Sequence, residues 1–174
     1  MLKLFTPNYY IHRFHVLRPE FLLEKGIKVL ICDIDNTLVP HDVALPSSQV
    51  KEFIKSFQEV GIQIVFISNN VEERVAKFAK GLNATYYYFA MKPLPFKYCK
   101  MLKKFKVKRN EVAVLGDQLM TDILGANIMK FYTILTAQVV ERDLSFTKIN
   151  RIFENMIFSL LKKTGKLVKG EYDE

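Results

Sequence analysis

The sequence predicts an α/β domain built on a parallel sheet, and three observations support this. Short apolar runs rich in β-branched residues alternate with helical patterns five times along the chain. The connections are short, with no long linker, repeat or low-complexity segment. Polar residues follow four of the strand runs directly. Because helices that alternate with strands cover both faces of a parallel sheet, we predict a doubly wound, five-stranded sheet.

The five strands are predicted at residues 27–32, 62–67, 85–89, 111–115 and 131–135. The first follows Gly26 and is apolar apart from Lys28, as expected for a strand buried on both faces. Helices are predicted between the strands. One starts near Pro46 and stops at Gly61, and the next has the capping-box spacing of Asn70 and Glu73. Two more helices follow, over 94–105 and up to about residue 129.

The predicted domain covers residues 1–145, in which the aromatic segment 1–25 forms an N-terminal packing arm, and residues 146–174 form a C-terminal helix and tail. This helix is amphipathic, because its apolar residues follow helical spacing: Ile149, Ile152, Phe153, Met156, Ile157, Leu160 and Leu161. Its apolar stripe could pack on the domain's own sheet, form the seam of a homodimer, or lie on a membrane or in a partner's groove. The sequence leaves these alternatives and the oligomeric state open.

The 174 residues include 26 basic and 18 acidic side chains, a balance of +8 that favours anionic partners. The stretch from Lys92 to Arg109 has eight basic residues and no acidic one. Its plainer interpretation is a solvated helix face. No recognition motif accompanies it, so binding of nucleic acid is disfavoured. No apolar run reaches the ~20 residues of a membrane span, and we expect a cytoplasmic protein with peripheral contact to an anionic membrane as an alternative. Cys32 and Cys99 lack metal-ligand spacing and are predicted to be buried thiols.

Acidic residues begin where the first predicted strand ends. Asp33 and Asp35 lie on the same side of an extended chain, and such a pair implies a shared proton or a bound cation. An Asx turn capping the strand is the simpler alternative. Ser68, Lys92 and Asp117 follow later strands. Right-handed crossovers would bring all these junctions to one edge of the sheet, where ligands of such folds bind.

These segments resemble the four ordered motifs of the haloacid dehalogenase-like (HAD) superfamily. The matching residues are Asp33-Ile34-Asp35-Asn36-Thr37, Ser68, Lys92 before Pro93, and Gly116-Asp117 with Asp122. The sequence around these residues includes Ile67-Ser68-Asn69-Asn70 and Lys92-Pro93-Leu94-Pro95. It is similar to the sequences of the YqeG-type phosphatases of HAD subfamily IIIA, roughly over residues 5–140. That subfamily is in turn similar to phosphatases that act on phosphatidylglycerophosphate.

The resemblance implies a phosphatase site. Asp33 would be the nucleophile that forms an aspartyl-phosphate, and Asp35 the general acid and base, oriented by Thr37. Ser68, Asn69 and Lys92 would hold the transferring phosphoryl group. Mg²⁺, which prefers oxygen ligands, would be bound by the Asp33 carboxylate, the Asp35 backbone carbonyl, Asp117 and the phosphate, with Asp122 behind these ligands or bound through water.

The spacing of the motifs leaves no room for a cap domain. Only a short flap fits between Thr37 and Pro46, and only one helix and one strand fit between Ser68 and Lys92. An open site admits a macromolecule, a lipid head group, or a small molecule covered by another subunit. We therefore carry three hypotheses: a Mg²⁺-dependent phosphatase acting on phosphatidylglycerophosphate, a soluble sugar- or nucleotide-phosphate phosphatase, and a non-catalytic RNA- or ribosome-binding protein on the same fold.

Overall fold

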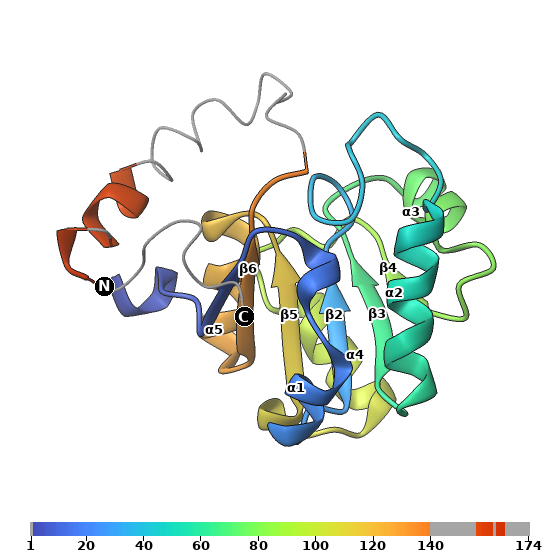
Figure 1. Ribbon diagram of the computed structural model, residues 1–174, viewed down its shortest axis with the longest axis horizontal. Helices are drawn as coiled ribbons and strands as arrows, with labels where there is room; N and C mark the ends of the chain where they lie inside the picture. The colour runs from blue at the N-terminus through green and yellow to red at the C-terminus, as the bar shows by residue number, and fades with distance from the viewer. Residues whose placement is uncertain (1, 140–155, 162, 166–174) are drawn as a thin grey trace.

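The computed structural model describes residues 2–139, 156–161 and 163–165, and contains one parallel sheet in the order β1-β6-β5-β2-β3-β4 (Figure 1). The strands are β1 (Tyr9–Ile11), β2 (Val29–Cys32), β3 (Gln63–Ile67), β4 (Thr85–Tyr87), β5 (Val112–Gly116) and β6 (Tyr132–Thr136). The prediction of a parallel α/β sheet is confirmed, but the count of five strands was wrong. The sixth strand, β1, lies in the segment predicted as a packing arm and pairs with β6, with Tyr9 opposite Ile134.

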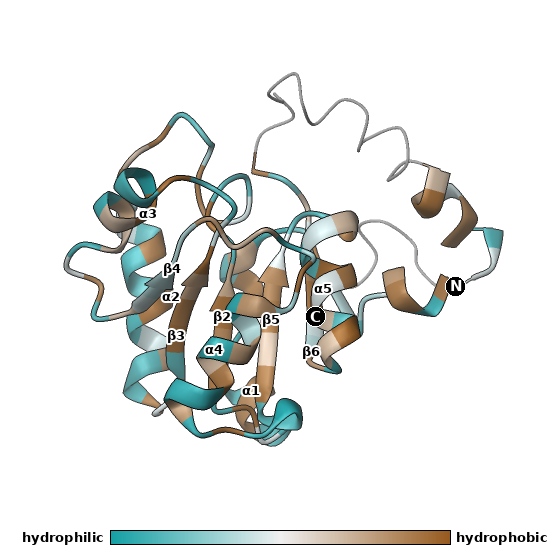
Figure 2. Ribbon diagram, turned by 180° about the vertical axis from the view of Figure 1, so that it is seen from behind, coloured by the Kyte–Doolittle hydropathy of each residue, from teal (hydrophilic) through white to brown (hydrophobic). Residues whose placement is uncertain are grey.

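Helices cover both faces of the sheet, as Figures 1 and 2 show from opposite sides. They are α1 (Pro19–Glu24), α2 (Ser48–Glu59), α3 (Glu72–Ala79), α4 (Phe96–Phe105) and α5 (Leu124–Met129), with short 3₁₀ turns at Leu2–Phe5, Phe14–Val16 and Arg109–Glu111. One core cluster joins α1, α2 and α3 to the sheet, and a second joins α4 and α5 to its other face. Strand β2 contributes to both clusters, with Leu30 in the first and Ile31 in the second, which explains its continuous apolar sequence.

Helix ends follow local signals in one case and not in another. The Ser47 hydroxyl accepts a hydrogen bond from the Val50 amide at 3.2 Å and caps α2. The capping box predicted at Asn70 is wrong, because α3 has Val71 at its N-cap position and no side-chain cap. The Asn70 amide group instead donates to Asp35 at 3.1 Å.

The described part of the C-terminal segment packs against the domain. Residues 156–161 are helical, and Leu161 is fully buried in a cluster with Leu119 and Ile123, against which Ile157 also packs. Met156 and Leu160 remain exposed, at 60% and 45%. The predicted stripe residues Ile149, Ile152 and Phe153 lie outside the described residues. Within those residues, no helix combines the length and apolar character needed to cross a bilayer.

The two cysteines differ from each other. Cys32 is buried in β2, as predicted. Cys99 is exposed on α4, so the prediction of a second buried thiol was wrong. The apolar face of α4 is instead formed by Tyr98 and Met101, one and two positions away. Cys99 therefore lies on the other side of the helix, towards solvent.

Candidate active site

The predicted site residues lie at the carboxyl edge of the sheet, beside its topological switch point. From β2 the chain continues to β3 and β4 on one side, and then returns to β5 and β6 on the other. The connections leaving β2 and β5 therefore diverge and open a crevice between them. Asp33 follows β2 and Asp117 follows β5, two strands that pair directly with Cys32 opposite Leu115. The fold alone thus brings two distant acidic residues together.

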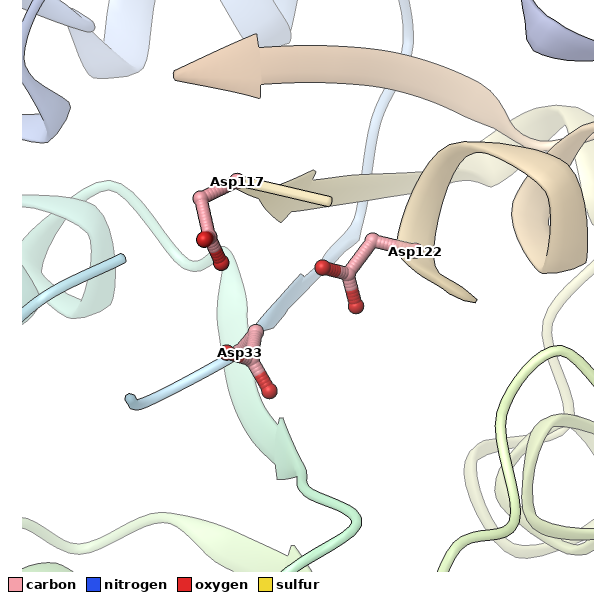
Figure 3. A group of neighbouring side chains, drawn as sticks. All are labelled: Asp33, Asp117 and Asp122. Atoms are coloured by element: carbon pink, nitrogen blue, oxygen red, sulfur yellow. The ribbon is translucent and has the colours of Figure 1, made fainter. Parts of the chain in front are cut away.

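Three buried carboxylates meet in this crevice (Figure 3). Asp33, Asp117 and Asp122 each offer an oxygen within 4.8 Å of the other two, and they are only 8%, 5% and 1% exposed. Asp122 comes from a π-helical turn, Leu119–Ile123, that follows β5. Its close approach requires Gly116, because a Cβ atom at that position would lie 2.5 Å from both Cβ and Oδ2 of Asp122.

Lys92 supplies the positive charge of this group. Its Nζ atom lies 2.5 Å from Asp33 Oδ1 and 2.6 Å from Asp122 Oδ1. An ammonium has three N–H donors, so one remains available beyond these two contacts. If ionised, three carboxylates beside one ammonium carry a net charge of −2, which a divalent cation would neutralise.

Burial shapes the protonation of these groups. It raises the pKa of Asp33 to about 7, with the charges of Asp122 and Asp35 acting in the same direction and Lys92 opposing them. The pKa of Asp117 is raised well above its usual value by burial and then by Asp122 and Asp33. For Lys92, burial alone would lower the pKa, yet the charges of Asp122 and Asp33 raise it above its ordinary value. Lys92 therefore stays protonated, whereas the buried carboxylates need further positive charge nearby in order to ionise.

Asp117 is oriented by two side chains. The Thr37 hydroxyl donates to its Oδ1 at 2.9 Å and the Gln138 amide to its Oδ2 at 2.9 Å. The contact from Thr37 to Asp33 Oδ2 is longer, at 3.4 Å. The expectation that Thr37 orients Asp35 was therefore wrong, because its hydroxyl points across the crevice to β5.

Asp35 has different surroundings from the triad. Its Oδ1 accepts from Arg74 Nη2 at 2.8 Å, and its Oδ2 accepts from Asn70 Nδ2 at 3.1 Å. Its side chain is 20% exposed. The Asp35 carboxylate is not among the clustered carboxylates, so of the metal ligands predicted from the sequence only the three others converge through their side chains.

Ser68 and Asn69 shape the loop that follows β3. The Ser68 hydroxyl is buried and accepts a hydrogen bond from the backbone N–H of Asn70 at 3.0 Å. The hydroxyl proton of Ser68 therefore remains available for donation. Asn69 bonds to the backbone of Lys92, accepting from its N–H at 2.7 Å and donating to its carbonyl at 3.4 Å. Asn69 thus holds the lysine in place, whereas the sequence had placed its side chain on the substrate.

The acidic group fits a divalent cation of the hard, oxygen-binding kind. Its donors are all carboxylate oxygens, its charge is unbalanced by two, and Thr37 and Gln138 fix the orientation of one ligand. The other predicted residues surround it: Lys92 between two of the carboxylates, and Thr37 on Asp117.

Sequence reasoning missed three residues of the site. Gln138 follows β6 beyond the four motifs, and its position after a strand beside β5 was its only signal. Asn70 was assigned to a helix cap. Arg74 stands in the first turn of α3, where a positive charge opposes the helix dipole, and this unfavourable position was a signal that could have found it.

Comparison with known proteins identifies the class to which this fold and site belong. Residues 18–129 match the family model of the haloacid dehalogenase-like hydrolases. The chain therefore belongs to the haloacid dehalogenase-like hydrolase family.

A curated relative is similar over nearly its whole length. The chain is 34% identical over 165 residues to the probable phosphatase YqeG of Bacillus subtilis, covering 95% of this chain and 96% of that protein. The cobalt-bound deoxy-D-mannose-octulosonate 8-phosphate phosphatase of Haemophilus influenzae superposes with a TM-score of 0.54 at 17% identity, covering 81% of this chain and 91% of its own. An uncharacterized protein from Listeria monocytogenes superposes with a TM-score of 0.53 at 16% identity, covering 79% of this chain and 99% of its own. These two show a shared fold. The predicted family, fold class and assignment as a hydrolase are confirmed.

Proposed function

We propose that this hydrolase is a Mg²⁺-dependent phosphomonoesterase that forms an aspartyl-phosphate on Asp33. The observation that carries the proposal is the cluster of Asp33, Asp117 and Asp122 at the switch point of the sheet, with Lys92 bonded to two of these carboxylates, Asp33 and Asp122. A phosphate monoester is an anion and resists attack by a carboxylate unless positive charge offsets the repulsion. When bound by Asp33, Asp117 and Asp122, together with the Asp35 backbone carbonyl, Mg²⁺ would supply part of that charge.

Each side chain then has a defined task. Asp33 attacks phosphorus, and the bond from phosphorus to the leaving oxygen breaks as Asp35 gives that oxygen a proton. Lys92 and the Ser68 hydroxyl donate to the phosphoryl oxygens. Asp35, now a carboxylate, takes a proton from the water that attacks the phosphoenzyme, which releases phosphate and restores Asp33.

We further propose that the substrate is a lipid phosphate, with phosphatidylglycerophosphate as the named candidate. Support comes from an apolar rim beside the site, defined as the exposed apolar residues on the connections that leave β2, β3 and β4, together with the first residue of α4: Val43, Leu45, Val71, Phe89, Met91, Leu94 and Phe96. They are 39–60% exposed. Figure 2 shows hydrophobic stretches on the connections above the strand arrowheads. Phe89 and Met91 also adopt positive φ angles of 43° and 55°, a costly conformation for bulky residues that often marks function.

Basic and aromatic side chains continue the rim on α4. Lys97 Nζ lies 5.5 Å from the centre of the Tyr88 ring, and Lys100 Nζ lies 5.9 Å from that of Tyr87. Tyr87 is buried, but Tyr88 is half-buried. Lysines and a partly exposed ring beside exposed apolar groups suit the interface of an anionic membrane, where rings lie at the head groups and lysines meet lipid phosphates. This gives Lys97 and Lys100, in the first half of α4, a role in peripheral membrane contact of a cytoplasmic protein.

The first test measures phosphate release from phosphatidylglycerophosphate in mixed micelles beside a panel of soluble sugar and nucleotide phosphates, with wild type and Asp33→Asn. We expect Mg²⁺-dependent turnover of the lipid that the substitution abolishes. Turnover of soluble esters alone would keep the chemistry and overturn the lipid substrate. No turnover of any ester would overturn the phosphatase proposal and favour a binding protein.

A second test isolates the rim. Phe96→Ser should weaken flotation with anionic vesicles and lower turnover of the lipid, while leaving turnover of a soluble ester unchanged. Val60→Ser is the matched control, because Val60 is an exposed apolar residue at the end of α2, at the opposite edge of the sheet. Equal effects of the two substitutions, or no effect of either, would contradict a role of the rim.

A further inference from the structure

Arg74 forms an ion pair with Asp35, although it does not belong to any of the four motifs. Its side chain extends from the first turn of α3 and is only 12% exposed. Nη2 donates to Asp35 Oδ1 at 2.8 Å, and Nη1 donates to the carbonyl oxygen of Ala44 at 3.1 Å. One guanidinium thus joins α3, the proposed general acid and base, and the flap, which we define as residues 38–46 between Thr37 and the N-cap of α2.

Stability alone gives a weak reason for this arrangement. A positive charge in the first turn opposes the helix dipole. Arg74 Nε is buried and has no hydrogen-bond partner among the described residues, and such an unpaired donor costs about 1–3 kcal/mol. The guanidinium nevertheless contacts Asp35, and its Cζ atom lies 5.8 Å from the centre of the Phe78 ring. Unfavourable local choices of this kind are expected where function selects the residue.

The contacts of Asp35 show what would be lost without the arginine. Asn70 holds the other carboxylate oxygen, so the two donors fix the carboxylate at both ends. Removal of Arg74 leaves Oδ1 without its donor and the flap without its bond at Ala44. Because proton transfer needs the carboxyl group within hydrogen-bond distance of the leaving oxygen, a small rotation of Asp35 would impair it.

We propose that Arg74 is a positioning residue that aims Asp35 at the leaving-group oxygen and couples this aim to the position of the flap. The inference rests on the proposed function, in which Asp35 protonates that oxygen. Arg74 acts through Asp35, because its hydrogen bonds go to Asp35 and Ala44 and not to the acidic triad or Lys92. Its contribution therefore depends on how much help the leaving group needs.

The dependence on leaving group gives a sharp test. An alkyl phosphate needs a proton on its leaving oxygen, whereas 4-nitrophenolate departs with little help. The ratio kcat/KM covers the steps up to phosphoryl transfer and so reports the leaving-group step. We expect Arg74→Met to lower kcat/KM about 30-fold for an alkyl phosphate and less than about 3-fold for 4-nitrophenyl phosphate. Arg74→Lys keeps the charge without the fork that spans Asp35 and Ala44, and should recover part of the loss.

A double-substitution cycle shows whether Arg74 acts through Asp35. In an Asp35→Asn protein, Arg74→Met should cause no further loss with the alkyl ester, because the acid that it aims is absent. Hydrogen exchange of the peptide covering the flap should be faster in Arg74→Met, and thermal unfolding checks that each variant is folded.

Equal losses for the two esters, or additive losses in the cycle, would overturn the positioning role. A full effect of Asp35→Asn without any effect of Arg74→Met would overturn this inference and leave the proposed function intact. Unchanged activity of Asp35→Asn would instead contradict the proposed function itself.

Discussion

Asp33 and Asp35 are separated by one residue, yet their surroundings differ in every respect that matters to chemistry. Asp33 lies among two further buried carboxylates and contacts Lys92, from the connection between β4 and α4. Asp35 lies outside that group, is more exposed, and contacts Arg74 of α3. The short motif brings both carboxylates to the edge of the sheet. Contacts from distant parts of the chain then suit Asp33 to attack on phosphorus and Asp35 to proton transfer.

The largest expected effect comes from removing the cation of Asp33. Lys92→Met deletes the ammonium that contacts two buried carboxylates and, in the proposed mechanism, the phosphoryl oxygens. We expect kcat/KM to fall by about 10³-fold, equally for alkyl and aryl phosphates, because this charge serves the phosphoryl group and not the leaving group. Steady-state kinetics with both esters measures it.

The neighbouring Lys97 provides the control, since its ammonium lies over the Tyr88 ring, whereas the ammonium on the carboxylates is that of Lys92. Lys97→Met should leave turnover of soluble esters unchanged. A strong preference of the Lys92→Met loss for one type of ester would mean that Lys92 and Arg74 do not serve separate halves of the site.

Asp35→Asn examines the other half of the comparison. The amide cannot deliver a proton, so we expect kcat/KM for an alkyl phosphate to fall by about 10²-fold and that for 4-nitrophenyl phosphate by about 10-fold or less. The phosphoenzyme on Asp33 should then accumulate, because the base that activates water is also gone. Rapid-quench trapping of labelled protein detects it, and equal losses with both esters and no accumulation would contradict the division of roles.

The contacts of Asp33 and Asp35 also show which features of the protein can be predicted from the sequence and which cannot. The strands, the acidic motif and the shared edge follow from apolar runs and from the rule that parallel strands end together. Strand β1 was missed because only three residues form it, among Arg and His residues that hide any period. Its partner β6 lies more than a hundred residues away, where Asn8 Oδ1 accepts from the Thr133 amide at 2.9 Å.

Side-chain partners were missed for a related reason. Thr37 was assigned to Asp35, its neighbour in the sequence, but its hydroxyl reaches Asp117, 80 residues away. Asn70 carries a helix-cap pattern, yet the second oxygen of the Asp35 carboxylate offers its side-chain amide a charged acceptor, which makes a stronger bond than the helix end does. Local spacing identified which residue types gather at the edge, and the packing of α3 and β5 decided which pairs form.

A smaller effect is expected at Gly116, which touches only the Asp33 side. In Gly116→Ala the new methyl group would collide with Asp122, so this carboxylate must move away from Lys92. We expect the concentration of Mg²⁺ that gives half-maximal activity to rise about 10-fold, with a loss of stability of about 1–3 kcal/mol. Gly125→Ala is the contrasting variant, because its Cβ would press on the Pro93 backbone at 3.1 Å, and no carboxylate is among its three nearest atoms. Similar shifts in the Mg²⁺ requirement for both variants would contradict the assignment of Asp122 to the metal.

The smallest effect concerns stability. Burial raises the pKa of Asp33 to about 7, whereas the unfolded chain loses this proton near pH 4. At Asp33 the folded state therefore holds more of the proton between these values, so the contribution of Asp33 to the free energy of unfolding falls as the pH rises through this window and levels off above about pH 7. A bound cation must displace that proton, so Mg²⁺ should stabilise the protein more at about pH 8 than at about pH 5. At ~100-fold excess over its Kd we expect a rise in Tm of about 5–10 °C at the higher pH. Asp33→Asn has no such proton at this position, so its response to Mg²⁺ should depend less on pH, with the buried Asp117 left as the carboxyl whose raised pKa still opposes the cation. A gain in wild-type Tm that is the same at both pH values would show that proton and cation do not compete at Asp33.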